Sequence, residues 1–241
     1  MLRAIAHPWA LRRGQDSSGA PVFKDRADGG ARLAERLSRY RTGDALVLGI
    51  PRGGVPVAAA VARGLGGELD IVVARKLAAP ISPELAIGAV TADGGRFLNE
   101  AMIQELGVDD AYLAQVTRAQ VADAKRREAR FRGGTAAPRV TGRTVILVDD
   151  GLATGATMIA AARSVRAQKP ARLVVAVPVG SREACRALEK EADEVVCLTT
   201  PDPFWAVGLF YEDFGQTEDG EVEQLLRDSR TNEPPVAVPG A

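Results

Sequence analysis

The stretch VILVDDGLATGAT, residues 145–157, decides how the whole sequence is interpreted. Its four leading apolar residues predict a strand that is buried on both faces, as in a parallel sheet. Two adjacent acids, Asp149 and Asp150, stand at the end of that strand. A run of small residues then leads into a helix predicted from about Thr157 to Gln168. The stretch thus predicts a strand, a loop with little side-chain bulk and a helix, in that order.

The loop after the two acids has the properties of a phosphate-binding site. Its glycine and small neighbours let the backbone approach a ligand closely, and the helix start offers unpaired N–H groups and the positive end of the helix dipole. Acids repel a phosphate, but Asp149 and Asp150 can accept hydrogen bonds from vicinal hydroxyls. We therefore expect a sugar 5-phosphate whose hydroxyls lie on these acids. The residues expected around its phosphate are Ala153, Thr154, Gly155, Ala156 and Thr157.

The rest of the chain continues the alternation of strands and helices. Continuous apolar runs predict further buried strands at residues 45–50, 69–74, 172–180 and 193–199. Helical patterns are found at residues 25–40, 57–63, 100–132 and 181–192. This order is typical of an α/β protein with an open, mainly parallel sheet of about five strands flanked by helices.

The chain is expected to hold one domain, at residues 23–226. Residues 1–22 are interpreted as a disordered N-terminal extension; their three arginines, one acid and serine pair make an organelle transit peptide the alternative. Residues 227–241 hold three prolines and no apolar period, so they are interpreted as a disordered C-terminal tail. No run of 18 apolar residues occurs, so no membrane-spanning helix is expected.

Composition narrows the functional classes further. The 31 basic and 31 acidic residues give a formal net charge of zero, which argues against a general nucleic-acid or membrane binder. The only histidine, His7, lies outside the predicted domain, which argues against histidine-based catalysis. Cys185 and Cys197 are interpreted as reduced thiols of a cytoplasmic protein, with a bond between them as the alternative.

The stretch at residues 145–157 resembles the fingerprint of the type I phosphoribosyltransferases in every position. The resemblance covers about residues 23–226. The segments IPRGGVPVA and RKLAAPISPELAIGAV are similar to a group of bacterial phosphoribosyltransferase-like proteins with an unassigned acceptor. The resemblance implies the family's α/β fold, with a small hood, a flexible loop and possible homodimers.

Two further loops match that family. The segment IPRGGVP, residues 50–56, stands where the family has its pyrophosphate loop. Arg52 offers a bidentate donor, and Gly53 and Gly54 let backbone amides face a diphosphate; a simple glycine turn is the alternative. Arg75 and Lys76, expected just past a strand, resemble the family's second pyrophosphate contact, although Arg75 can instead be a surface ion-pair partner.

The segment at residues 77–90 corresponds to the family's flexible loop, which closes over the site. From the residues alone it is a mobile loop or a small hairpin, with residues 95–99 as the return strand.

The resemblance implies displacement at the anomeric carbon of phosphoribosyl pyrophosphate by a nitrogenous base. Asp149, Asp150 and Lys76 would be the catalytic residues, with the acids orienting the ribose and stabilising positive charge on it. Mg²⁺ would be held mostly by substrate oxygens and water, with Asp149 and Asp150 as its nearest protein groups.

The acceptor is expected under the hood formed by residues 200–216, which hold five of the eleven aromatic residues. The spacing WAVGLFYE is loosely similar to the base-binding segment of the hypoxanthine-guanine phosphoribosyltransferases. It suggests Trp205 as a stacking residue, with Tyr211 and Glu212 as further base contacts. Those enzymes carry an acid where this chain has Ala153, and a hydrophobic lid is the alternative for the aromatic cluster.

Other functions remain open at this stage. A non-catalytic sensor of phosphoribosyl pyrophosphate or of a nucleotide would use the same fold. A hydrolase or transferase acting on a ribose 5-phosphate would keep the phosphate loop but would not require Arg52 or Lys76. An RNA-binding form would need a basic face, for which residues 125–132 are the one candidate.

Overall fold

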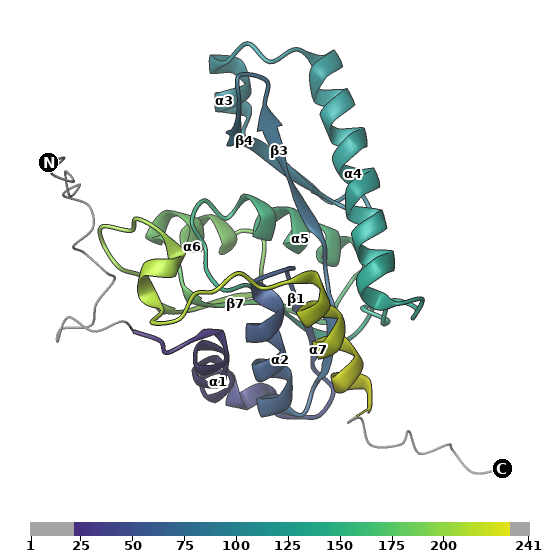
Figure 1. Cartoon of the computed structure of the whole chain (residues 1–241), viewed down its shortest axis with the longest axis vertical. Coiled ribbons are helices and arrows are strands. Elements are labelled where there is room, and N and C mark those ends of the chain that lie inside the picture. The colour runs from purple at the N-terminus through teal and green to yellow at the C-terminus, as the bar shows by residue number, and fades with distance from the viewer. Residues whose placement is uncertain (1–21, 232–241) are drawn as a thin grey trace, which may run out of the picture.

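A computed structural model describes residues 22–231. The predicted extension up to residue 21, and the predicted tail from residue 232 onwards, lie outside the described residues. Within the described range, the α/β architecture expected from the sequence is confirmed (Figure 1). No helix of this part of the chain has both the length and the apolar character to cross a membrane.

The centre of the molecule is a five-stranded sheet in which every neighbouring pair of strands is parallel. Its order is β2-β1-β6-β7-β8. The strands are β1 (Leu46–Gly49), β2 (Glu68–Ile71), β6 (Thr144–Val148), β7 (Arg172–Val179) and β8 (Glu194–Thr199). Both faces of the sheet are covered, which explains the continuous apolar runs in the sequence.

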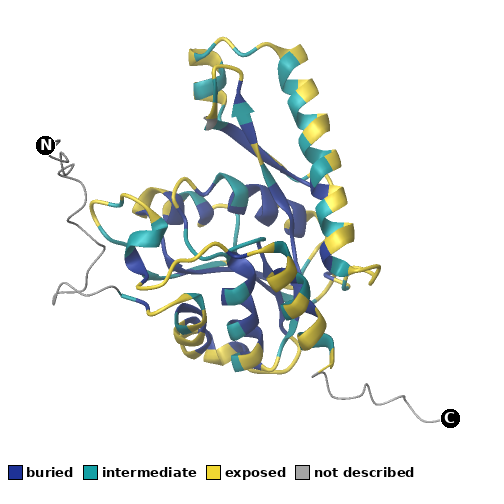
Figure 2. Ribbon diagram, viewed as in Figure 1, coloured by how far each residue is buried: buried dark blue, intermediate teal, exposed yellow. Residues whose placement is uncertain are grey.

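Helices pack on the two faces of this sheet (Figures 1 and 2). One face is covered by α1 (Arg26–Arg36), α2 (Gly54–Leu65) and α7 (Asp219–Thr231), and the other by α5 (Ala156–Ala167) and α6 (Arg182–Leu188). Helix α7 runs five residues past the predicted end of the domain, so residues 227–231 are helical rather than part of a disordered tail. Two short 3-10 turns, η2 (Ser38–Tyr40) and η3 (Val207–Phe210), complete this part.

Close packing brings α1 against α2. A Cβ atom added to Gly30 would lie 2.5 Å from the carbonyl oxygen of Val57, and one added to Gly64 would lie 2.5 Å from Ala34 Cβ. The two helices can therefore approach this closely only because both positions are glycine. This contact fixes the start of α1, and Asp25 caps that start by accepting from the backbone N–H of Asp28.

An arm projects from the central sheet (Figure 1). It consists of an antiparallel sheet, β3 (Ala74–Ala79), β4 (Ser82–Thr91) and β5 (Arg96–Leu98), with helices α3 (Glu100–Glu105) and α4 (Asp110–Arg132). Residues 77–90 thus form the hairpin that the sequence allowed, rather than an irregular loop. The strand predicted at residues 69–74 ends at Ile71, so Arg75 and Lys76 lie within β3 and not in a loop.

Asp93, between β4 and β5, anchors the arm to α5. Its carboxylate accepts hydrogen bonds from the hydroxyls of Ser164 (2.6 Å) and Thr91 (2.7 Å) and from the side-chain amide of Gln168 (3.3 Å). Burial raises the pKa of Asp93, but the hydrogen bonds from Ser164 and Thr91 outweigh it and hold the pKa below its usual value.

The interpretation of the two cysteines as reduced thiols is wrong for this structure. Cys185 of α6 and Cys197 of β8 form a disulfide across 12 positions of sequence. Both cysteines pack in the same hydrophobic cluster, on the face of the sheet that α5 and α6 cover. Sequence spacing alone does not show this, because it does not fix which faces of the two elements meet.

Candidate active site

The acids and the glycine pair meet at one edge of the central sheet. Asp149 and Asp150 follow β6, and Gly53 and Gly54 follow the neighbouring parallel strand β1. Loops at the carboxyl ends of adjacent parallel strands converge, and this edge is where open α/β sheets bind ligands. The predicted acids and the predicted pyrophosphate loop therefore belong to one site.

The glycine pair lies directly against the acids. A Cβ atom added to Gly53 would overlap Asp150 Oδ2, and one added to Gly54 would lie 2.8 Å from Asp149 Oδ1. Any side chain at these positions would have to displace a carboxylate. The pair is thus more than a simple glycine turn, because its missing side chains make room for the two acids.

The small-residue loop is fixed to the neighbouring strand β7. Leu152 N–H donates to the carbonyl of Val179 (2.9 Å), and the Ser181 hydroxyl donates to the carbonyl of Ala153 (2.8 Å). Gly155 has φ 76° and precedes the first residue of α5, where no side chain caps the helix. The first N–H groups of α5 are therefore left for an anion, as expected for a phosphate loop.

Arg26 of α1 is a site residue that the sequence did not reveal. Its Nε donates to Asp150 Oδ2 (2.9 Å), its Nη1 donates to the carbonyl of Gly215 (2.7 Å), and its guanidinium lies 3.9 Å from the ring centre of Phe214. These contacts join three segments that are far apart in sequence. An arginine that follows a helix cap gives no signal of its own in a single sequence.

The electrostatics of the two acids depend on this arginine. Burial raises the pKa of Asp149 well above its usual value, and the neighbouring charge of Asp150 raises it further. Burial also raises the pKa of Asp150, while the positive charge of Arg26 and its hydrogen bond lower it. Arg26 is therefore the counter-ion that offsets the repulsion between two neighbouring, partly buried carboxylates.

A cleft of about 450 Å³ opens above Asp150. Its walls come from α1, the loop after β1, the loop after β6 and the segment before α7. They are formed by Arg26, Arg52, Gly53, Asp150, Phe214, Gly215, Gln216 and Thr217. Residues 214–216 belong to the hood expected from the sequence, and Thr217 follows them directly.

Two arginines predicted to contact the pyrophosphate lie close to acids of this chain. Arg52 Nη1 lies 3.5 Å from Asp219 Oδ1 at the start of α7. Arg75 Nε lies 2.8 Å from Asp123 Oδ2 of α4, so Arg75 is an ion-pair partner, which was the alternative for this residue. Lys76 follows it on β3 and points to the opposite face of that strand.

The hood forms where the early and late parts of the chain meet. Phe23 N–H donates to the carbonyl of Phe210 (2.9 Å), and Glu212 N–H donates to the carbonyl of Phe23 (2.8 Å). Phe23, Val179, Phe210 and Tyr211 form a buried cluster. Most of the aromatic residues of this segment therefore form a hydrophobic lid. This was the alternative to a base-binding role for the aromatic cluster.

The assignment of Tyr211 as a base contact is wrong. Its side chain is 4% exposed, and its hydroxyl donates to the carbonyl of Asp150 (2.6 Å). Its ring stacks on Phe214, with ring centres 5.1 Å apart. Trp205 is 72% exposed and does not line the cleft, and Glu212 is exposed. Base contacts by Trp205 and Glu212 stay predictions.

Within the described residues, no group of three or more histidine, cysteine or acidic side chains is arranged to hold a metal ion. The acids of the site are the adjacent pair Asp149 and Asp150. This donor set suits a metal that takes most of its ligands from a substrate and from water.

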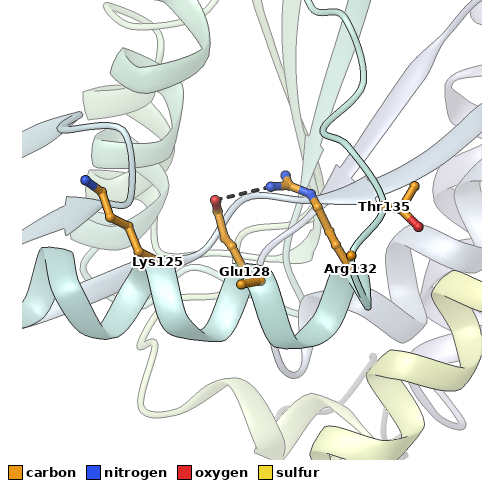
Figure 3. A pocket seen from close by; sticks show the side chains of 6 residues that line it. Lys125, Glu128, Arg132 and Thr135 are labelled. Carbon is orange, nitrogen blue, oxygen red and sulfur yellow. Dashed lines mark hydrogen bonds and ion pairs between the residues drawn. The ribbon is translucent and has the colours of Figure 1, made fainter.

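The basic run at residues 125–132 is compensated by acids. Arg126 and Arg127 pair with Asp123, and Arg130 pairs with Asp219 and Glu223. Arg132 pairs with buried Asp70 and with Glu128; the latter pair is seen in Figure 3, beside a hollow of about 330 Å³. These acids lower the positive potential of this face, which disfavours the RNA-binding alternative.

Known proteins with similar sequences and structures identify the family of this chain. Residues 23–214 match the model of the phosphoribosyl transferase domain. A candidate phosphoribosyl transferase of Mycobacterium tuberculosis, found in two strains, is 46% identical over 205 residues, which are 85% of this chain and 46% of that protein. This chain thus spans about half the length of the curated relatives it matches.

A solved structure is similar as well. The crystal structure of TT1426 from Thermus thermophilus has a TM-score of 0.73 and 46% sequence identity, and the match covers 86% of this chain and 98% of that one. The chain belongs to the phosphoribosyl transferase family, a glycosyltransferase class of enzymes.

Proposed function

We propose that this chain transfers the phosphoribosyl group of phosphoribosyl pyrophosphate to a nitrogenous base and releases pyrophosphate. The observation that carries the proposal is the meeting of three elements at one edge of the sheet. These are the glycine pair after β1, the acids after β6 and the uncapped start of α5. Together they offer acceptors for ribose hydroxyls and N–H groups for a 5-phosphate, held in place by the close approach of the glycine pair.

Each element has a separate task in this proposal. The loop at residues 153–157 binds the 5-phosphate through backbone N–H groups and the hydroxyls of Thr154 and Thr157. Asp149 and Asp150 orient the ribose and stabilise positive charge on its ring as the bond to pyrophosphate breaks. Arg52 and the amide of Gly53 bind the leaving diphosphate, whereas the amide of Gly54 already donates to the carbonyl of Ile50 (3.0 Å).

Binding of the diphosphate also has to compete with acids of the chain. Arg52 is near Asp219 and Arg75 is paired with Asp123, so both guanidinium groups must exchange a carboxylate for phosphate oxygens. Lys76, on the other face of β3, reaches the diphosphate in this proposal only if the arm moves toward the cleft.

Mg²⁺ is proposed as the cofactor. Asp149 and Asp150 are the protein groups that would lie next to it, together with oxygens of the diphosphate and the ribose. When bound, the metal would neutralise charge on the leaving diphosphate.

Residues near the acids restrict the class of the acceptor. Ala153 cannot serve a base nitrogen as an acid would, and Tyr211 is committed to the hood. A nitrogenous base other than a 6-oxopurine therefore fits better. A homodimer and a cytoplasmic location stay predictions.

The test is pyrophosphate release from phosphoribosyl pyrophosphate and Mg²⁺, with a panel of purine, pyrimidine and pyridine bases. The double variant Asp149→Asn with Asp150→Asn is the blank. We expect release with one base and none in the blank, while the circular dichroism spectrum is unchanged. Wild-type activity in the double variant would overturn the assignment of the acids.

The sensor alternative gives a different result in the same experiment. A sensor would bind phosphoribosyl pyrophosphate, detected by calorimetry, yet would release pyrophosphate with no base of the panel. If the double variant then failed to bind phosphoribosyl pyrophosphate, the assignment of the binding site would stand. The proposed transfer activity would be overturned.

A further inference from the structure

A closed ring of contacts surrounds Asp150. Arg26 Nε binds the carboxylate, the Arg26 guanidinium lies on the ring of Phe214, and that ring stacks on Tyr211. The Tyr211 hydroxyl then returns to the carbonyl of Asp150. Arg26 thus holds the side chain of Asp150, and Tyr211 holds its backbone carbonyl. The ring of Phe214 connects the two.

Arg26 binds one of the two carboxylate oxygens of Asp150, a residue that lines the cleft. Arg26 engages Oδ2, and the glycine at position 53 lies against that same oxygen. Arg26 Nε thus leaves Oδ1, the other oxygen of this carboxylate, unbound. The Arg26 and Asp150 side chains are only 14% and 16% exposed, so water competes weakly with this ion pair.

Arg26 also ties the acid to the wall of the cleft. Its Nη1 donates to the carbonyl of Gly215, which lines the cleft beside Phe214. A lysine in its place has one compact ammonium group and cannot span Asp150, Gly215 and the ring at once. The three contacts of Arg26 therefore require the branched shape of the guanidinium as well as its charge.

We propose that Arg26 is a positioning residue, which orients Asp150 toward the ribose hydroxyls and holds the segment at residues 214–217 beside the bound sugar. This inference rests on the proposed function, because it requires the sugar phosphate to bind at the acids. It adds a residue of the opening helix to the recognition of the sugar. Arg26 does not touch the reacting atoms in this role.

Direct binding of sugar phosphates tests the inference without turnover. Calorimetry compares ribose 5-phosphate with its 2-deoxy and 3-deoxy analogues. A hydrogen bond to a charged group is worth roughly 10- to 100-fold in affinity, so the wild-type chain should disfavour at least one analogue by that factor. In Arg26→Gln the preference for ribose over that analogue should fall to within about threefold, because Asp150 is no longer oriented.

Two further variants separate positioning from folding. Arg32→Gln is the matched control, since Arg32 also lies on α1, pairs with Asp28 at 3.0 Å and lies 5.4 Å from the ring centre of Phe23. It should keep the wild-type preference. Arg26→Lys keeps the charge and should recover part of the preference, and thermal unfolding verifies that all three variants are folded.

The outcomes distinguish this inference from the proposed function. If Arg26→Gln weakens binding of all three sugars equally, or leaves the preference intact, Arg26 has no positioning role. If the wild-type chain binds none of the sugar phosphates, both the inference and the proposed function are overturned. Loss of preference in Arg26→Gln alone supports the positioning role even if no base accepts the phosphoribosyl group.

Discussion

The hydroxyl of Tyr211 donates a hydrogen bond of 2.6 Å to the backbone carbonyl of Asp150. The bond joins the hood to the residue that is proposed to bind the ribose. Tyr211 is buried, and both burial and the nearby charge of Asp150 raise its pKa, so it stays a neutral donor. The hood therefore covers this end of the sheet and also fixes the position of the Asp150 backbone.

Replacing Tyr211 with phenylalanine should weaken both the fold and the site. The buried carbonyl of Asp150 loses its donor, which should lower the free energy of unfolding by about 1 kcal/mol. Urea denaturation measures this change, and calorimetry measures the expected loss of ribose 5-phosphate affinity.

Tyr112→Phe is the control for that variant. The Tyr112 hydroxyl donates to the carbonyl of Ala78 in the arm (3.0 Å). The Tyr112→Phe variant therefore loses a similar hydrogen bond at a place away from the acids. Its stability should fall by a comparable amount while its affinity is unchanged. Equal losses of affinity in the two variants would contradict a special role for Tyr211.

Adding a methyl group at Gly53 should remove ligand binding without unfolding the chain. In Gly53→Ala the new Cβ would overlap Asp150 Oδ2, so the carboxylate must rotate away from Arg26 or the loop must shift. We expect phosphoribosyl pyrophosphate affinity to fall by at least about tenfold, the loss of one hydrogen bond to a charged group. Calorimetry measures this affinity.

Gly220→Ala is the matched substitution, because a Cβ atom at Gly220 in α7 meets nothing within 4 Å. Its affinity should equal that of the wild-type chain. A Gly53→Ala variant with wild-type affinity would show that the close approach of glycine and acid is unnecessary for binding.

Asp93 should make the stability of the chain depend on pH in the acid range. Its pKa is lower in the folded chain than the value of about 3.9 for an unfolded chain. The stability it contributes is therefore fully present above about pH 4 and is lost as the pH falls through the lower, folded pKa. Urea denaturation from pH 7 to pH 3 should show a flatter profile for Asp93→Asn.

The corresponding control is Asp202→Asn. The Asp202 side chain is 71% exposed, and its ion pair with Arg182 measures 3.9 Å. Its profile should follow the wild-type curve at every pH. If Asp93→Asn followed that curve too, the hydrogen bonds of Asp93 would not anchor the arm.

Arg132 should be essential for stability because of buried Asp70. The guanidinium donates to Asp70 Oδ2 at 3.0 Å and to the carbonyl of Ile71 at 3.0 Å. Arg132→Met leaves a buried carboxylate unpaired, which should cost about 3–5 kcal/mol of unfolding free energy. The double variant with Asp70→Asn should recover part of that loss, and no recovery would mean that the pairing with Asp70 is not the cause.

The sequence predicted those parts of the molecule whose pattern is local. The apolar runs before Gly49 and before Asp149 became adjacent parallel strands, as is typical of continuous apolar runs in a sheet covered on both faces. The acids and the loop before α5 could be predicted for the same reason, since strand, loop and helix follow each other directly. The meeting of the two loops then followed from the α/β class.

Parts that depend on distant contacts could not be predicted. Arg26 and Gly215 meet across 189 positions of sequence, and nothing near either residue indicates the other. Tyr211 was assigned to a base because aromatic residues stack on ligands and on each other equally well. The strand at residues 69–74 was predicted too long, because the turn after Ile71 contains no glycine or proline.

The pairing of Phe23 with the backbone of residues 210–212 also has a consequence for synthesis on the ribosome. The central strands up to β7 can pair while later residues are still being added, but the hood needs both its early and its late segment. Until residues up to Thr217 have emerged, Asp149 and Asp150 lack their cover and Arg26 lacks the carbonyl of Gly215. A nascent chain therefore acquires a framework first and a competent site last.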